Sequence, residues 1–168
     1  MNLPTSLRPA VPVLAFAAGL AALVAAAPVQ AQYNQYLRHD AAKCRGEGPA
    51  IRISITDVKS SRGTLRVQLY RATRADWLET GRWLNRIELP ARAGTMSVCM
   101  PAPGPGSYGI AVRHDVNDND STDLTQDGGG ASNNPSFNIF NLGKPSHTKA
   151  AFSLGNEVKA MTIRMRYM

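Results

Sequence analysis

Residues 106–115 of the chain read Gly-Ser-Tyr-Gly-Ile-Ala-Val-Arg-His-Asp. Every second side chain in this stretch, from Tyr108 through Ile110 and Val112 to His114, falls on one face of an extended chain. Successive side chains of a strand point to opposite faces, so this pattern is typical of a strand that buries one face. The stretch therefore predicts a half-buried β-strand with these four side chains directed inward.

Four further segments alternate with the same two-residue period. They are residues 51–55, 65–69, 95–100 and 161–167. The first two are separated by turn-forming residues at 59–63, which predicts a β-hairpin. Residues 83–89 resemble a weaker strand, and residues 72–81 hold the only plausible helical turn. The chain is therefore expected to form an all-β domain, an antiparallel β-sandwich of about seven strands.

The first 31 residues have the composition of a signal peptide. Arg8 is the only charged residue before Arg38, and residues 10–27 are almost wholly apolar. Small residues follow in Pro28-Val29-Gln30-Ala31, as at a signal-peptidase site. A membrane anchor is the alternative, because the apolar run is close to the shortest that spans a bilayer.

We expect cleavage after Ala31. The mature chain then has an N-terminal arm at residues 32–47, followed by one domain at residues 48–168. No transmembrane segment remains, and the protein is expected to be periplasmic or secreted.

Cys44 and Cys99 are the two cysteines of the chain. Export would place them in an oxidising compartment, which predicts a disulfide bond; two free buried thiols are the alternative. The alternation in residues 95–100 directs Cys99 away from the apolar face of its strand. We therefore expect it to point toward the arm that carries Cys44.

Several motifs resemble the DUF2141 family of exported bacterial domains. Residues 106–115 resemble its P-G-x-Y-A-hydrophobic-x-x-H-D signature, which Asn117 and Asn119 continue as H-D-x-N-x-N. Residues 130–135 are similar to its G-F-S-N-N stretch, and residues 143–152 to its G-x-P…A-x-F element. The motif positions in this chain are His114, Asp115, Ser132, Asn133, Asn134 and Pro145.

The resemblance implies an immunoglobulin-like or transthyretin-like sandwich and implies no activity. The chain departs from the family pattern at two positions. Asp120 stands where the family usually has Gly, and Ala131 stands where it has an aromatic residue.

The long polar segment from Asp115 to Asn141 is unusual in a compact domain, where such connections are often functional. Its beginning repeats oxygen-bearing side chains, which hard cations such as Ca²⁺ require in numbers of six to eight. The candidate calcium ligands are Asp115, Asn117, Asn119 and Asp123. The alternative is a loop in which Asp and Asn side chains accept hydrogen bonds from nearby backbone amides.

The sequence contains no arrangement of residues that strongly indicates catalysis. Adjacent residues of a strand point to opposite faces, so His114 and Asp115 should not pair as a base and its orienting acid, and His114 is expected to be a buried structural residue. We therefore expect a non-enzymatic binding or structural module of the cell envelope. The alternative is an envelope hydrolase that uses carboxylates of residues 115–127.

Charge is unevenly distributed along the chain. The formal net charge is +7, with 19 Lys and Arg against 12 Asp and Glu. Five acids lie in one stretch without any Lys or Arg: Asp115, Asp118, Asp120, Asp123 and Asp127. The basic remainder suits an anionic envelope component or a protein as partner. Nucleic acid is not expected, because the chain is exported and aromatic residues do not alternate with its basic positions.

Overall fold

The computed structural model describes residues 32–46, 48–136 and 144–168. The predicted signal peptide, residues 1–31, lies outside these ranges. A large sheet contains β1 (Gln35–Tyr36), β3 (Thr64–Arg71), β4 (Asn85–Pro90), β6 (Gly106–Asp115), β7 (Gly128–Ala131), β8 (Phe152–Leu154) and β10 (Arg166–Tyr167). A small sheet contains β2 (Ala50–Val58), β5 (Gly94–Pro101) and β9 (Val158–Arg164).

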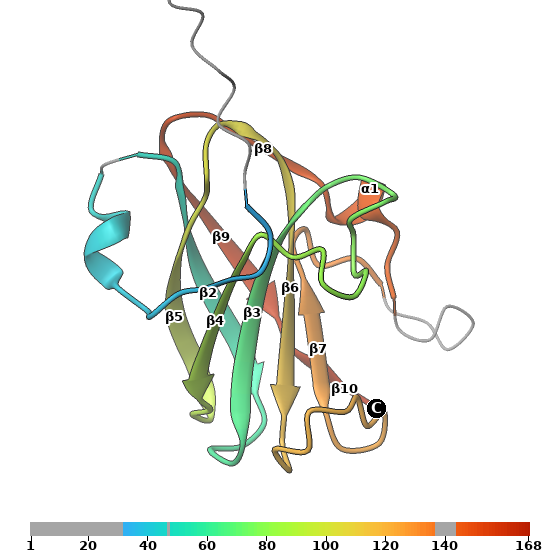
Figure 1. Cartoon of the computed structure of the whole chain (residues 1–168). Coiled ribbons are helices and arrows are strands. Elements are labelled where there is room, and N and C mark those ends of the chain that lie inside the picture. Colours follow the sequence, from blue (N-terminus) through green and yellow to red (C-terminus); the bar gives the residue numbers. More distant parts are fainter. Residues whose placement is uncertain (1–31, 47, 137–143) are drawn as a thin grey trace, which may run out of the picture.

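The two sheets form the layers visible in Figure 1. The strand order is β1-β4-β3-β6-β7-β10 in the large sheet, with β8 paired to the first residues of β6. The order in the small sheet is β5-β2-β9. Most pairs are antiparallel, as expected, but β2 runs parallel to β9 and β1 parallel to β4, so both sheets are mixed.

One hydrophobic core takes side chains from both sheets. The alternating residues predicted to face inward do so: Ile51, Ile53, Ile55, Leu65, Val67, Leu69, Val98, Met100, Tyr108, Ile110, Val112 and Ile163. Full burial of a side chain of this size contributes about 1.5–3 kcal/mol, so these strand faces dominate the stability of the fold. Within the described ranges, no helix has the length and apolar character needed to cross a membrane.

The predicted hairpin of residues 51–55 with 65–69 is wrong. The first run lies in β2, which pairs with β5 and β9, whereas the second lies in β3, which pairs with β4 and β6. The connecting turn crosses from one sheet to the other, so the two apolar faces meet across the core. Gly63 makes the crossing possible, because its φ is +73° and a Cβ there would lie 1.9 Å from the Asp115 carbonyl oxygen.

Residues 72–84 form a succession of turns rather than a helix, with one helical i→i−4 bond from Trp77 N to the Thr73 carbonyl, 3.0 Å. Trp77 and Trp83 pack with Tyr70 on the outer face of the large sheet. Gly109 leaves room for the Trp77 ring, since a Cβ there would come within 2.6 Å of it. The two short helices lie elsewhere: η1 (Ala41–Cys44) and α1 (His147–Ala150).

The predicted disulfide is present and joins Cys44 to Cys99. Both residues are buried, and Cys99 faces the N-terminal arm as the alternation predicted. Asp40 begins η1 by accepting the Ala42 amide at 2.9 Å, and Arg52 of β2 donates to the Cys44 carbonyl. The later part of the arm, around η1, is thereby fixed to the outside of the small sheet, whereas β1 belongs to the large sheet.

Candidate functional site

His114 is fully buried and hydrogen-bonded on both sides of its ring. Its Nε2 lies 2.7 Å from the Arg62 carbonyl oxygen, and its Nδ1 lies 2.7 Å from the Tyr167 hydroxyl. A carbonyl can only accept, so Nε2 carries the hydrogen, and in the neutral ring Nδ1 then accepts from Tyr167. The Tyr167 oxygen in turn accepts the Lys59 amide at 2.9 Å. His114 therefore connects β6, the β2–β3 turn and β10.

Asp115 points to the opposite face from His114, as expected. Its Oδ1 accepts the Asn119 amide at 3.2 Å, and its Oδ2 accepts the Asp120 amide at 2.9 Å. Arg113 also donates to Oδ2 at 3.0 Å. This buried carboxylate thus fixes the beginning of the loop that follows β6.

Asp127 fixes the other end of this loop. Its Oδ1 accepts the Val116 amide at 3.1 Å and its Oδ2 accepts the Asp123 amide at 3.0 Å. Between these two buried acids, residues 117–122 are exposed. The loop therefore has an ordered frame that presents polar side chains to solvent.

The four candidate calcium ligands are only partly brought together. Asn117 and Asn119 both direct their side-chain amides to Asp123 Oδ2, at 3.0 and 2.7 Å. Asp115 instead turns both oxygens toward backbone amides. In the part of the chain that the structure describes, no cluster of three or more His, Cys, Asp or Glu side chains is arranged to hold a metal ion.

The Ser132-Asn133-Asn134 motif joins three elements by side-chain bonds to the backbone. Ser132 Oγ accepts the Ile110 amide of β6 at 3.0 Å and donates to the Ala150 carbonyl. Asn133 donates to the Ala151 carbonyl at 2.7 Å.

Asn134 pairs with the free edge of β9. Its side chain donates to the Thr162 carbonyl at 2.8 Å and accepts the Arg164 amide at 2.7 Å. Asn133 and Asn134 have φ values of +63° and +48°, a conformation that Asn tolerates better than most residues. The motif therefore acts as a structural corner that closes one side of the sandwich.

Pro145, the last motif position, accepts a hydrogen bond from the indole nitrogen of Trp77 at 2.8 Å. The bond fastens the 72–84 segment to the chain before α1. No sequence pattern predicted this contact, because the two residues lie 68 positions apart.

Asp120 has a partner that its position in the sequence did not reveal. Its carboxylate lies 2.6 Å from Arg66 Nη2, and the charge and hydrogen bond of Arg66 lower the pKa of Asp120. Its φ is +60°, a left-handed conformation that favours glycine. The acidic loop therefore folds against basic residues of the large sheet instead of forming a separate acidic pole.

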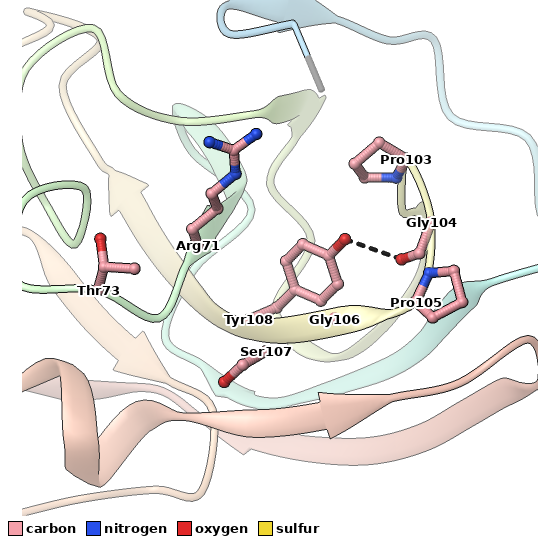
Figure 2. A pocket seen from close by; sticks show the side chains of 8 residues that line it. All are labelled: Arg71, Thr73, Pro103, Gly104, Pro105, Gly106, Ser107 and Tyr108. Carbon is pink, nitrogen blue, oxygen red and sulfur yellow. Dashed lines mark hydrogen bonds between the residues drawn. The ribbon is translucent and has the colours of Figure 1, made fainter. Parts of the chain in front are cut away.

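A shallow pocket of about 270 Å³ lies at the opposite end of the sandwich (Figure 2). The ring of Tyr108 lies between Arg71 on one side and the Pro103–Gly106 turn on the other. Tyr108 donates its hydroxyl to the Gly104 carbonyl at 2.8 Å, and burial raises its pKa. Arg71 is held by Tyr33, whose hydroxyl is 3.1 Å from Nη1.

The β2–β3, β4–β5 and β6–β7 connections lie at one end of the sandwich, the lower end in Figure 1, which we call the loop end. The Ala93 amide of the β4–β5 turn donates to Ser61 Oγ of the β2–β3 turn at 2.9 Å, and the latter turn contacts β6 through His114. Lys59, Arg62 and Arg92 are exposed on these turns. Among the described residues, no carboxylate forms an ion pair with Arg62 or Arg92.

Comparison with known proteins identifies the family. Neither a curated protein nor a solved structure is significantly similar to the chain. Residues 53–162, which contain most of β2, all of β3 to β8 and most of β9, match the DUF2141 family, described as an uncharacterized protein conserved in bacteria. The protein is therefore a member of the DUF2141 family.

Proposed function

We propose that the protein is an exported, non-enzymatic binding module, with an immunoglobulin-like or transthyretin-like sandwich, that contacts an anionic phosphate-bearing surface of the bacterial cell envelope. The observation that carries the proposal is the loop end. There, Arg62 and Arg92 extend from short, hydrogen-bonded turns without an ion-pair partner among the described residues. Loops held by a rigid scaffold are common binding elements.

The shape of this end favours an extended partner over a small ligand. The basic side chains are exposed at the tips of two turns that are joined by a hydrogen bond from the Ala93 amide to Ser61 Oγ. A charged surface can contact several turn tips at once, and its attraction falls off within about 8–10 Å at physiological salt. Binding of this kind should therefore weaken steeply as salt is added.

The hydrogen bonds of the motif residues favour a binding role over hydrolysis. His114 has both ring nitrogens bonded, and Asp115 and Asp127 each accept backbone amides with both oxygens. Ser132 is buried between two backbone groups. These contacts hold the fold together and leave the motif side chains poorly placed to act on a substrate.

The exported location is a part of this proposal that can be tested separately. The disulfide supports it, because such bonds persist in oxidising compartments. Expression of the full chain in a bacterial host should release a mature protein that begins at Gln32. Recovery of the intact chain in the membrane fraction would favour the anchor alternative.

Calcium binding by the β6–β7 loop is a second proposal, and the convergence of Asn117 and Asn119 on Asp123 favours it. Either amide could present its oxygen after a rotation about its last bond. Millimolar Ca²⁺ should raise the melting temperature of the EDTA-treated domain, since binding to the native state must stabilise it. Asp123→Asn should abolish the rise, whereas Asp118→Asn should retain it. An unchanged melting temperature would exclude a significant site.

The envelope proposal is tested with the mature protein and lipid vesicles. Vesicles containing phosphatidylglycerol are compared with pure phosphatidylcholine, using a double substitution Arg62→Gln and Arg92→Gln. Each basic residue near an anionic membrane contributes about 1 kcal/mol, so this variant should bind about 30-fold more weakly.

The matched control removes two charges from the other end of the sandwich. Arg74 and Lys149 are both exposed there, and Arg74→Gln with Lys149→Gln changes the net charge by the same amount. Equal loss of binding in both double variants would show that only net charge matters and would reject the loop end as the binding site.

A further inference from the structure

Two arginines lie directly opposite each other on the outer face of the large sheet. Arg66 of β3 is in register with Arg113 of β6. Like charges in this position destabilise a strand pair unless other groups compensate them. Their side chains are only 14% and 18% exposed, so water solvates them poorly.

Each of the two arginines has one acidic partner supplied by a strand. Arg66 Nε lies 2.6 Å from Glu88 Oε1 of β4, and Arg113 Nη2 lies 3.0 Å from Asp115 Oδ2 of β6. A third carboxylate, that of Asp120 in the loop between β6 and β7, lies near both arginines.

Asp120 contacts both arginines. Its Oδ1 lies 2.6 Å from Arg66 Nη2 and 3.8 Å from Arg113 Nη2, and its backbone carbonyl accepts Arg113 Nη1 at 3.0 Å. The Asp120 side chain is nevertheless 83% exposed, and its backbone has a left-handed φ of +60°. Ion pairs that involve an exposed partner contribute little to stability, so this carboxylate is weakly held.

Arg113 also has a polar atom without a partner. Its Nε is buried and makes no hydrogen bond within the described structure. Buried donors of this kind are rare and often mark a group that a ligand or solvent molecule would satisfy. The guanidinium thus retains a hydrogen-bonding capacity that the protein itself does not use.

We propose that Arg66 and Arg113 form a binding site for a small oxyanion group, a carboxylate or a phosphate, and that Asp120 is its built-in, exchangeable occupant. The ligand oxygens would replace the Asp120 carboxylate at Arg66 Nη2 and Arg113 Nη2. Guanidinium groups suit this role because their planar donors match both kinds of oxyanion. The site does not depend on the envelope contact proposed above, which other side chains make.

The test compares two substitutions in the same loop. Asp120→Asn removes the carboxylate that occupies the site, and Asp118→Asn removes a carboxylate without a described contact to either arginine. Both residues are exposed and have left-handed φ values, +60° and +55°, and both variants raise the net charge by one. Asn is well tolerated in this conformation, so both variants should fold.

Binding of inorganic phosphate and of acetate is measured calorimetrically at constant ionic strength. Comparing the two anions shows whether the site prefers a phosphate or a carboxylate. The Asp120→Asn variant should bind at least one of these anions tenfold or more tightly than the wild type or Asp118→Asn. Adding Arg113→Gln to Asp120→Asn should remove the gain. Equal affinities of the two single variants would overturn the proposal.

The same site can be tested in the wild-type protein, without any substitution. Nuclear magnetic resonance resolves arginine Nε–Hε groups, so the signals of Arg66 and Arg113 can be followed while phosphate or acetate is added to the wild type. Both signals should shift together and saturate. Shifts confined to exposed arginines such as Arg92 would contradict the proposed site.

Discussion

The hydroxyl of Tyr167 donates a hydrogen bond to the buried ring of His114 across 53 residues of sequence, with an oxygen-to-nitrogen distance of 2.7 Å. The Lys59 amide donates to the same hydroxyl, and the other ring nitrogen donates to the Arg62 carbonyl. These bonds form one continuous chain in which every group has a partner. It joins the last strand to the central strand of the large sheet and to the turn that crosses between the sheets.

Replacing Tyr167 with Phe should therefore destabilise the fold. The variant keeps the ring beside Gly128 but leaves His114 Nδ1 buried without a donor, and such a loss costs about 1–3 kcal/mol. Urea unfolding followed by fluorescence measures the free energy of unfolding. Tyr36→Phe, at a 65% exposed position, should change it little. Equal stabilities of the two variants would contradict the role assigned to this bond.

The substitution Ser132→Ala should lower the free energy of unfolding by more than the loss of one small hydroxyl group suggests. The substitution leaves the Ile110 amide and the Ala150 carbonyl without their partner in a fully buried place. Because each unsatisfied group costs about 1–3 kcal/mol, the free energy of unfolding should fall by about 2 kcal/mol or more. Ser153→Ala, at an exposed position of β8, serves as the control and should remain close to the wild type.

Loss of the disulfide should lower stability by about 4 kcal/mol, since the bond closes a loop of 55 residues in the unfolded chain. The double substitution Cys44→Ser and Cys99→Ser should also release the N-terminal arm from the small sheet. Hydrogen exchange would then rise in residues 40–46 before it rises in β2. Unchanged exchange in the arm would show that other contacts are sufficient to hold it.

Asp76 should make stability depend on pH in the acid range. Burial is the largest influence on this carboxyl group and raises its pKa, but hydrogen bonds from Thr73 and Tyr33, together with the charges of Arg82 and Arg71, outweigh it and lower the pKa below its usual value. A carboxylate with a lowered folded-state pKa stabilises the protein above its unfolded-state pKa of about 3.9. That contribution is lost as the pH falls through the folded-state pKa.

The Asp76→Asn variant should accordingly be less stable than the wild type at pH 7. The difference between the two should shrink as the pH is lowered from about 5 toward 2. Denaturant unfolding at several pH values measures both quantities. A difference that stays constant over this range would mean that the carboxylate charge does not contribute.

The sequence predicted the features that depend on local periodicity. The alternation in residues 106–115 correctly placed Ile110 and Val112 in the core and His114 and Asp115 on opposite faces. The same reasoning placed Cys99 opposite the apolar face of β5, toward Cys44. In each case the direction of a side chain follows from the two-residue repeat of an extended chain.

Pairing between distant segments could not be predicted in this way. A short turn between two alternating runs usually indicates a hairpin, yet here it connects two sheets, because each apolar face is buried against the other sheet. The parallel pairing of Ile53 in β2 with Met161 in β9 is not indicated by the sequence around either residue. The same holds for Asp120, whose partner Arg66 lies 54 positions away.

The proposed contact between the turns of the loop end and an anionic envelope surface is tested by the apparent dissociation constant of the mature protein on phosphatidylglycerol vesicles. We expect salt-sensitive binding that weakens about 30-fold in the Arg62→Gln, Arg92→Gln variant and far less in the Arg74→Gln, Lys149→Gln control. No binding by the wild type, or the same loss in both variants, would contradict it.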